Sequence, residues 1–274
     1  MRNLFVFHSN FLSYKHYLVL FLSINFSNIN ASILKNNPAD TLSTKQLGIL
    51  LINDLLNRKD FQMYHVGECI SVHYAEACAA FGAIRLAALL NDSSMIIKLK
   101  NRYKKVIDDN IPNTANHVDA NVYGILPLEL FLHTNDSIFF NQGITLANKQ
   151  WENPLSDGMS NQTRFWIDDI YMISSLQVQA FRATGNYIYL QRCAYEIYNY
   201  ITKLQQPNGL FHHGANAPFF WGRGNGWVAA GLIELLYVLP DTNFYYPIIK
   251  ESFVKMIDID KLEPYFIKYH NKGF

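Results

Sequence analysis

The sequence carries almost no net charge, which limits the classes of ligand it can attract at long range. Its 23 lysine and arginine residues nearly balance its 22 aspartate and glutamate residues, so the formal net charge is +1. A nucleic-acid-binding domain, or a protein that binds an anionic membrane surface, displays a clear excess of basic residues. We therefore expect no nucleic-acid partner. An acidic ligand would have to be bound by individual cations within a site.

Cysteine is scarce, and its spacing excludes the common metal and redox motifs. The three cysteines, Cys69, Cys78 and Cys193, form neither a Cys-x-x-Cys pair nor a zinc-ligand pattern. Cys78 and Cys193 fall within helical patterns, so we expect buried free thiols there. The adjacent His212 and His213 have no further histidine, cysteine or acid at metal-ligand spacing. The sequence predicts neither a metal nor a cofactor.

Alternating strand patterns are also missing, and helical periodicity dominates the chain. Half of the residues are hydrophobic and 15% are aromatic, which is typical of a folded globule. The periodicity predicts helices over residues 44–57, 71–90, 94–108, 120–133, 136–151, 168–184, 187–204, 226–239 and 245–259. We expect an all-α fold.

Two kinds of helix alternate along the chain. The helix at 71–90 and the segment at 230–239 are apolar around most of their girth, which indicates burial on several sides. Those that begin near residues 94, 136 and 187 carry polar side chains on one face and should lie outside. Long joints lead back to the inner helices about every fifty residues, and these joints hold the polar and aromatic motifs. This period predicts helix hairpins closed into an α/α toroid, with the motifs at one mouth. A plain helical solenoid is the alternative.

The N-terminal segment has the composition of an export signal. Arg2, Lys15 and His16 precede an apolar run over residues 17–26, and small and polar residues follow it. The run is short for a membrane span and fits the hydrophobic region of a secretory signal peptide. We expect a signal peptide over residues 1–31 and an exported protein, periplasmic or secreted. A stray N-terminal helix or a misassigned start codon is the alternative, with a cytoplasmic location.

The stretch Arg164-Phe165-Trp166-Ile167-Asp168-Asp169-Ile170-Tyr171-Met172 is the most informative part of the chain. It places two carboxylates behind a tryptophan, where a polar loop becomes a helix. Asp168 either caps that helix by accepting backbone N–H bonds or projects into the mouth. In the second case, repulsion from Asp119 would raise its proton affinity, so that one of the two carboxyl groups stays protonated near neutral pH. Asp169 is the better candidate for a structural acid of the first turn.

A second aromatic stretch, Phe220-Trp221-Gly222-Arg223-Gly224-Asn225-Gly226-Trp227, places a guanidinium between indoles at another helix entrance. Its glycines allow the backbone to approach a ligand closely, and flanking indoles would hold Arg223 in place. A solvated surface arginine is the alternative. Tyr74 lies near the start of an inner helix, either as a site residue or as a core tyrosine. Carboxylates, arginine and aromatic rings at helix entrances are what a carbohydrate-cleaving site requires.

Together these residues resemble the unsaturated rhamnogalacturonyl hydrolases of glycoside hydrolase family 105 and the related unsaturated glucuronyl hydrolases of family 88. The resemblance extends from about residue 71 to the C-terminus and rests on the combined spacing of several motifs. These motifs are Val72-His73-Tyr74, Val118-Asp119-Ala120-Asn121-Val122-Tyr123-Gly124, the stretch from Trp166 to Met172, Gly209-Leu210-Phe211-His212-His213, and the stretch from Trp221 to Trp227.

The resemblance implies an (α/α)6 barrel and a glycoside hydrolase that removes a 4,5-unsaturated uronic acid from the non-reducing end of lyase-generated oligosaccharides, such as pectin or glycosaminoglycan fragments. In these families an aspartate protonates the C4=C5 double bond and water adds at C5. By motif, the proton donor falls on Asp168 and the second family acid on Asp119. The substrate-contacting positions fall on Tyr74, Trp166, Met172, His213, Arg223 and Trp227.

The predicted helices are fewer than a complete barrel of six hairpins contains. We therefore expect a barrel domain over residues 32–274 that is truncated at the C-terminus. Two other classes of function stay open. One is a different α/α-barrel sugar enzyme, such as a lyase or an epimerase, and the other is a non-catalytic sugar-binding remnant.

Overall fold

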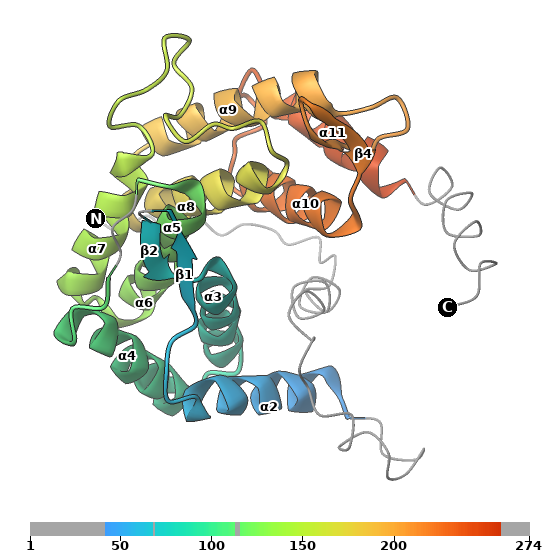
Figure 1. Ribbon diagram of the computed structural model, residues 1–274. Coiled ribbons are helices and arrows are strands. Elements are labelled where there is room, and N and C mark those ends of the chain that lie inside the picture. The colour runs from blue at the N-terminus through green and yellow to red at the C-terminus, as the bar shows by residue number, and fades with distance from the viewer. Residues whose placement is uncertain (1–41, 68, 113–115, 259–274) are drawn as a thin grey trace, which may run out of the picture.

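The computed structural model describes residues 42–258, except residues 68 and 113–115. Over this part the chain is mostly helical, and its helices follow one another around an arc (Figure 1). The predicted signal peptide at residues 1–31 lies outside the described residues. Within them, no helix has both the length and the apolar character needed to cross a membrane.

Inner and outer helices alternate around the arc, as the sequence predicted. The inner helices are α3 (Tyr74–Leu89), α6 (Ile125–Thr134), α8 (Asp168–Thr184) and α10 (Gly222–Leu236), and each contacts the next. The outer helices are α2 (Thr44–Asn57), α4 (Ser93–Asp108), α7 (Ser137–Lys149), α9 (Ile188–Leu204) and α11 (Tyr246–Ile257). Helix α8 is buried along most of its length because α6, α9 and α10 pack around it. The buried Cys78 and Cys193 are free thiols, as expected.

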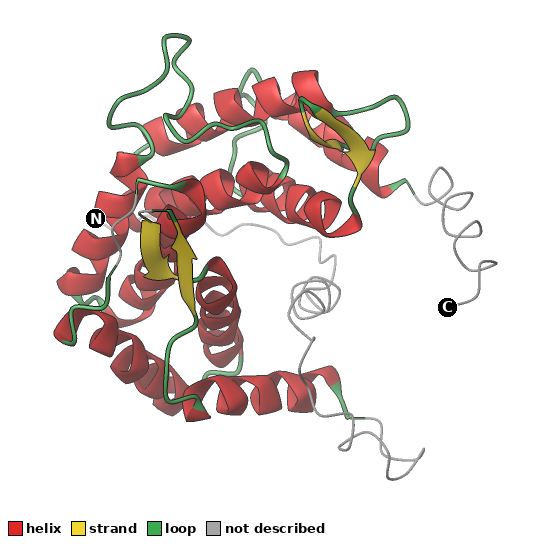
Figure 2. Ribbon diagram, viewed as in Figure 1, coloured by secondary structure: helices red, strands yellow, loops and turns green. Residues whose placement is uncertain are grey.

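The expectation of no strands was wrong at two places (Figure 2). Strands β1 (Met63–Val66) and β2 (Cys69–Val72) form one antiparallel hairpin, and β3 (His212–Gly214) and β4 (Ala217–Phe220) form another. In the first, Gly67 at the turn has φ of 56°, a conformation that glycine adopts without strain. Each strand is too short to show a period of two, so the sequence pattern does not predict it.

Several helix boundaries also differ from those predicted. Because β2 extends to Val72, helix α3 begins at Tyr74, and the His73 ring accepts a bond from the backbone N–H of Ala75. The predicted helix at 120–133 divides into α5 (Val118–Asn121), a 3-10 turn η3 (Val122–Gly124) and α6. Helix α10 begins at Gly222 and not at residue 226, so Arg223 lies in its first turn.

A polar network joins the inner helices near their C-terminal ends. Glu234 of α10 forms ion pairs with Arg85 of α3 at 2.6 Å and with Arg182 of α8 at 2.8 Å. Arg182 also donates to Gln179, whose amide donates to Glu129 of α6. We call these five residues the floor network. It ties together four helices at the end of the bundle opposite the predicted motifs, which lie at the helix entrances.

Candidate active site

The motif around Trp166 lies where the chain enters α8. The N-cap residue of this helix is Ile167, and Asp168 is the first helical residue, so Asp168 is not the cap. The backbone N–H of Ile167 donates to the carbonyl of His213, which joins the start of α8 to the β3–β4 hairpin. Trp166 is half exposed and Asp168 is partly buried. The tryptophan and the carboxylate therefore share a helix entrance that is open to solvent.

Asp169 points into the protein and holds the chain that precedes it. Its carboxylate is fully buried and accepts bonds from the Arg164 guanidinium at 2.6 and 3.0 Å and from the Tyr200 hydroxyl at 2.7 Å. The backbone N–H of Arg164 donates to it as well, at 3.1 Å. These contacts fit the structural role that the sequence predicted for Asp169.

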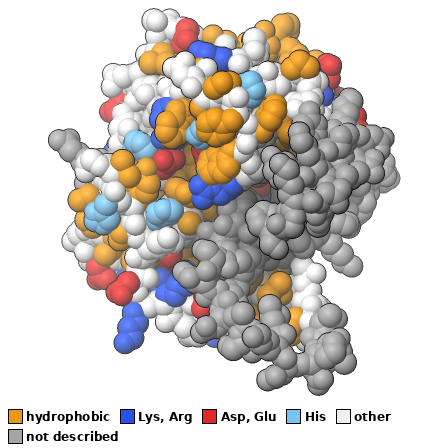
Figure 3. Space-filling view, turned by 45° about the vertical axis from the view of Figure 1, so that its right-hand side comes forward, with side chains coloured by type: hydrophobic (Ala, Val, Ile, Leu, Met, Phe, Trp, Pro, Cys, Tyr) orange, Lys and Arg blue, Asp and Glu red, His pale blue; other side chains and the backbone are white. Residues whose placement is uncertain are grey.

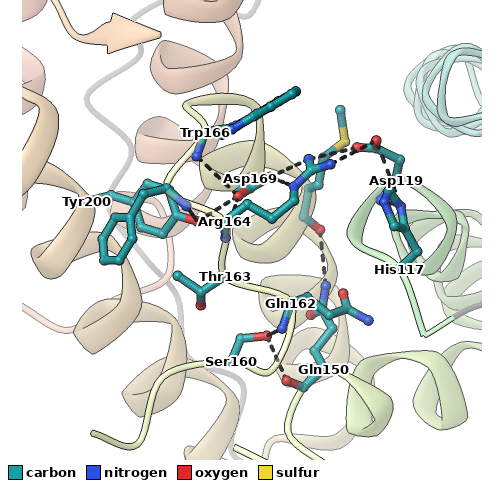
Figure 4. Close-up of polar contacts among 12 residues, drawn as sticks. His117, Asp119, Gln150, Ser160, Gln162, Thr163, Arg164, Trp166, Asp169 and Tyr200 are labelled. Carbon is teal, nitrogen blue, oxygen red and sulfur yellow. Dashed lines mark hydrogen bonds and ion pairs between the residues drawn. The ribbon is translucent and has the colours of Figure 1, made fainter. Parts of the chain in front are cut away.

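Arg164 joins the two acidic motifs. Its guanidinium lies 3.4 Å from the carboxylate of Asp119, in addition to its ion pair with Asp169 (Figure 4). Burial lowers the pKa of Arg164, but the charges of Asp169 and Asp119 outweigh this effect and raise it above its ordinary value. A permanently charged guanidinium therefore stands between carboxylates that are distant in sequence.

Asp119 belongs to the short helix α5 and is 9% exposed. The His117 ring caps this helix by accepting a bond from the Asp119 backbone N–H at 3.2 Å. The Asp119 carboxylate accepts a bond from the Tyr64 hydroxyl of β1 at 3.1 Å. These contacts, together with Arg164, leave Asp119 in one defined orientation.

The surroundings of Asp168 favour its protonated form. Burial raises the pKa of Asp168 above its usual value, and the charges of Asp169 and Asp119 raise it further. The backbone N–H of Asp168 itself and the nearby His213 act in the opposite direction. The repulsion predicted from Asp119 is thus present, but desolvation is the larger cause. A carboxyl group with a raised pKa in an open site is suited to proton transfer.

Aromatic rings form a wall beside Asp168. The His213 ring lies 5.3 Å from the Trp166 ring, 5.1 Å from Trp221 and 5.2 Å from Phe219, measured between ring centroids. The Arg223 guanidinium stacks over Trp221 at 4.4 Å. On the face drawn in Figure 3, hydrophobic side chains gather with basic, acidic and histidine side chains. The predicted stacking of Arg223 therefore involves Trp221.

Two of the predicted substrate contacts lie below the surface. Met172 is 1% exposed and Trp227 is 2% exposed, and both belong to the hydrophobic core. Trp227 packs against Tyr171 at 4.8 Å and meets the Tyr74 ring edge-on at 6.2 Å. Tyr74 is partly buried, and this burial raises the pKa of its hydroxyl. The charges of Asp119 and Asp168 raise the pKa further, and that of Arg223 lowers it. Tyr74 thus connects the core to the mouth.

The comparison with protein families decides the classification. The model of Glycosyl Hydrolase Family 88 matches residues 52–263, which include every predicted site residue. The chain belongs to glycosyl hydrolase family 88. No curated protein matches it.

Solved structures show the same fold as this family 88 chain. A possible family 105 member from Salmonella enterica has a TM-score of 0.66 at 14% identity, over 84% of this chain and 70% of that one. A family 88 glycosyl hydrolase from Bacteroides vulgatus has a TM-score of 0.57 at 18% identity, over 78% and 67%. A polysaccharide lyase has a TM-score of 0.59 at 18% identity, over 78% and 66%. The fold is that of the (α/α)6 barrels of families 88 and 105.

Two residues of the candidate site, Arg164 and Tyr64, were not predicted from the sequence. Arg164 belongs to the motif around Trp166, but the sequence predicted no role for it. No local sequence pattern shows that its partner Asp119 lies close. Tyr64 was missed because its hairpin was not recognised, although Gly67 three residues later is a turn signal. This turn signal predicts a hairpin with Tyr64 on its first strand, and the structure brings that strand to Asp119.

A small polar cavity adjoins Arg164. It has a volume of about 150 Å³ and lies between residues 116–118 and residues 161–164. Within the described ranges, no three histidine, cysteine, aspartate or glutamate side chains form a cluster that could hold a metal ion. The side chains described at this site include carboxylates, a guanidinium and aromatic rings.

Proposed function

We propose that this family 88 protein is a hydrolase that removes a 4,5-unsaturated uronic acid from the non-reducing end of lyase-generated oligosaccharides. The observation that carries this proposal is the partly buried Asp168, whose pKa is raised at a solvent-open helix entrance. Family membership supports the same reaction class. A carboxyl group whose pKa is raised by burial is suited to donate a proton in an acid-catalysed hydration.

In the proposed reaction, Asp168 transfers its proton to C4 of the C4=C5 double bond, and positive charge develops at C5 and the ring oxygen. Water bonds to C5 and returns a proton to the Asp168 carboxylate. The product is a hemiketal, which opens and releases the remaining sugar. Asp119 lies near enough to affect the charge state of Asp168, and its negative charge would stabilise the cationic transition state. This differs from hydrolysis by two carboxylates that flank the glycosidic carbon.

The substrate contacts follow from the wall of the site. Trp166 and His213 offer rings that can stack on the partly planar unsaturated sugar. Arg223, which stacks over Trp221, would pair with the sugar carboxylate in the proposed complex. Tyr74 offers its hydroxyl from the base of the mouth. We assign Met172 and Trp227 to the buried layer directly beneath the sugar, because both side chains are buried.

Incubation with lyase-generated disaccharides tests the proposal. The double bond absorbs ultraviolet light, so hydration should reduce the absorbance with time, and the Asp168→Asn variant should not. A rise in absorbance on intact polysaccharide would instead identify a lyase. This second assay is included because a solved polysaccharide lyase has a similar fold. Binding without any absorbance change would support a sugar-binding remnant or an epimerase. Disaccharides that end in rhamnose or a glucosamine-type sugar would identify the leaving group.

The same proposal includes export. Substrates made by polysaccharide lyases arise where polysaccharide is degraded, and the N-terminal sequence has the pattern of a signal peptide over residues 1–31. Cell fractionation, with detection of the processed N-terminus by mass spectrometry, tests this location. An unprocessed protein in the cytoplasm would contradict it.

A further inference from the structure

The chain between the two site residues Arg164 and Trp166 is strained. Phe165 has φ of 54°, in the left-handed region that a bulky side chain adopts only at a cost. The turn at Phe165 directs Arg164 toward Asp119 and leaves Trp166 half exposed at the mouth. Strain of this kind persists only where surrounding contacts hold it in place.

Tyr200 of the outer helix α9 supplies such contacts. Its buried hydroxyl accepts a bond from the backbone N–H of Phe165 at 3.2 Å and donates to the Asp169 carboxylate at 2.7 Å. Its ring packs on the Phe165 ring with 4.9 Å between centroids. One side chain therefore holds both the strained residue and the acid that pairs with Arg164.

Glu196 lies one helical turn before Tyr200, so the two side chains project from the same face of α9. It is fully buried, and its carboxylate accepts a bond from the backbone N–H of Ser160 at 3.0 Å. Its second oxygen contacts the Thr163 hydroxyl. Burial of a carboxyl group is unfavourable unless polar partners surround it, and here both partners belong to the segment that leads to Arg164.

We infer that Glu196 and Tyr200 are positioning residues that hold residues 160–165 so that Arg164 faces Asp119 and Trp166 faces the mouth. The Ser160 hydroxyl fixes the start of this segment by donating to the carbonyl of Gln150 at 2.7 Å (Figure 4). The outer helix thereby sets the geometry of the inner site. The kinetic consequence of this inference rests on the proposed function.

Two conservative variants test the inference. Tyr200→Phe keeps the packed ring and removes both hydrogen bonds, and Thr163→Val keeps the shape and removes the contact with Glu196. Because displacement of a site group by about 1 Å can cost about 100-fold in rate, we expect kcat/KM to fall about 10- to 100-fold in each. The matched control is Tyr189→Phe, which removes a hydrogen bond from α9 to Asn148 away from residues 160–165. It should retain wild-type kcat/KM.

A double-mutant cycle with Arg164→Ala separates positioning from general stability. If Tyr200 acts through Arg164, Tyr200→Phe should cost much less in the Arg164→Ala background, because coupled residues are non-additive. Fully additive losses would overturn the inference, as would a Tyr200→Phe enzyme with the kcat/KM of the Tyr189→Phe control.

Limited trypsin digestion tests how firmly residues 160–165 are held, and this measurement does not depend on enzyme activity. Release of residues 160–165 should increase the rate of cleavage after Arg164 in Tyr200→Phe and Thr163→Val, with the site identified by mass spectrometry. The control should be cleaved as slowly as the wild type. Equal rates in all four proteins would overturn the positioning role. If the wild type lacks hydrolase activity, the proposed function fails while this test still decides how the segment is held.

Discussion

Replacing Asp168 with asparagine should change activity and stability in opposite directions. Asparagine has nearly the same shape, and because the N-cap of α8 is Ile167, the substitution leaves the cap unchanged. It removes the proton that the proposed reaction transfers to C4. General acid–base groups contribute about 10²–10⁴-fold to rate, which corresponds to about 2.7–5.4 kcal/mol of activation free energy. We expect kcat/KM to fall by that factor.

The effect on stability follows from the raised pKa of Asp168. A carboxyl group whose pKa rises on folding stabilises the protein below its unfolded pKa, and this contribution is lost as the pH rises through the folded pKa. Ionising Asp168 therefore costs more in the folded protein than in the unfolded chain, because the carboxyl group is desolvated and faces the charges of Asp169 and Asp119. The neutral asparagine removes this cost, so the variant should melt at a higher temperature than the wild type at pH 7. The difference should shrink as the pH falls below the usual pKa of aspartate.

Absorbance assays and thermal melts at several pH values measure both effects on the same preparations. An Asp168→Asn enzyme with near-normal turnover would refute the proton-donor role of Asp168. A variant that is inactive and also less stable at neutral pH would show that the asparagine disrupts the site. That result would contradict the electrostatic reasoning.

Three further outcomes follow from the contacts described above. Arg223→Lys keeps the charge but loses the planar guanidinium and its stacking on Trp221, so affinity for the unsaturated disaccharide should fall. If the variant bound charged and carboxyl-reduced substrates with equal affinity, Arg223 would have a structural role only. Glu234→Gln should lower the free energy of unfolding by about 1.5–3 kcal/mol, because two arginines lose a charged partner. Burial raises the pKa of Glu234 but its arginine partners lower it on balance, so this loss should be largest at neutral pH and should shrink in acid. Asp169→Asn should lower the melting temperature, since Arg164 loses its closest ion pair; an unchanged melting curve would contradict the structural role.

The local sequence determined much of the helical framework. The bounds of α2 and α8 agree with the predicted 44–57 and 168–184 because their signals are local. Ser43 forms a capping box at the start of α2, and Gly185 ends α8 in the left-handed conformation. The inner character of α3 and α10 was likewise predicted from apolar residues around most of each helix. The acidic and aromatic motifs were identified for the same reason, since each is contiguous in the chain.

Only the tertiary structure decided which of these motifs interact. Arg164 meets Asp119 across 45 positions of sequence, and Tyr200 reaches Asp169 across 31, distances over which no local pattern carries information. The same holds for Trp227, whose indole packs against Tyr171 and is 2% exposed. Helical periodicity depends on neighbours three and four residues away, whereas the orientation of a side chain at a helix entrance depends on which other helices pack beside it. The sequence therefore determined most of the helices and the chemical groups, and the packing of the barrel decided how those groups face one another.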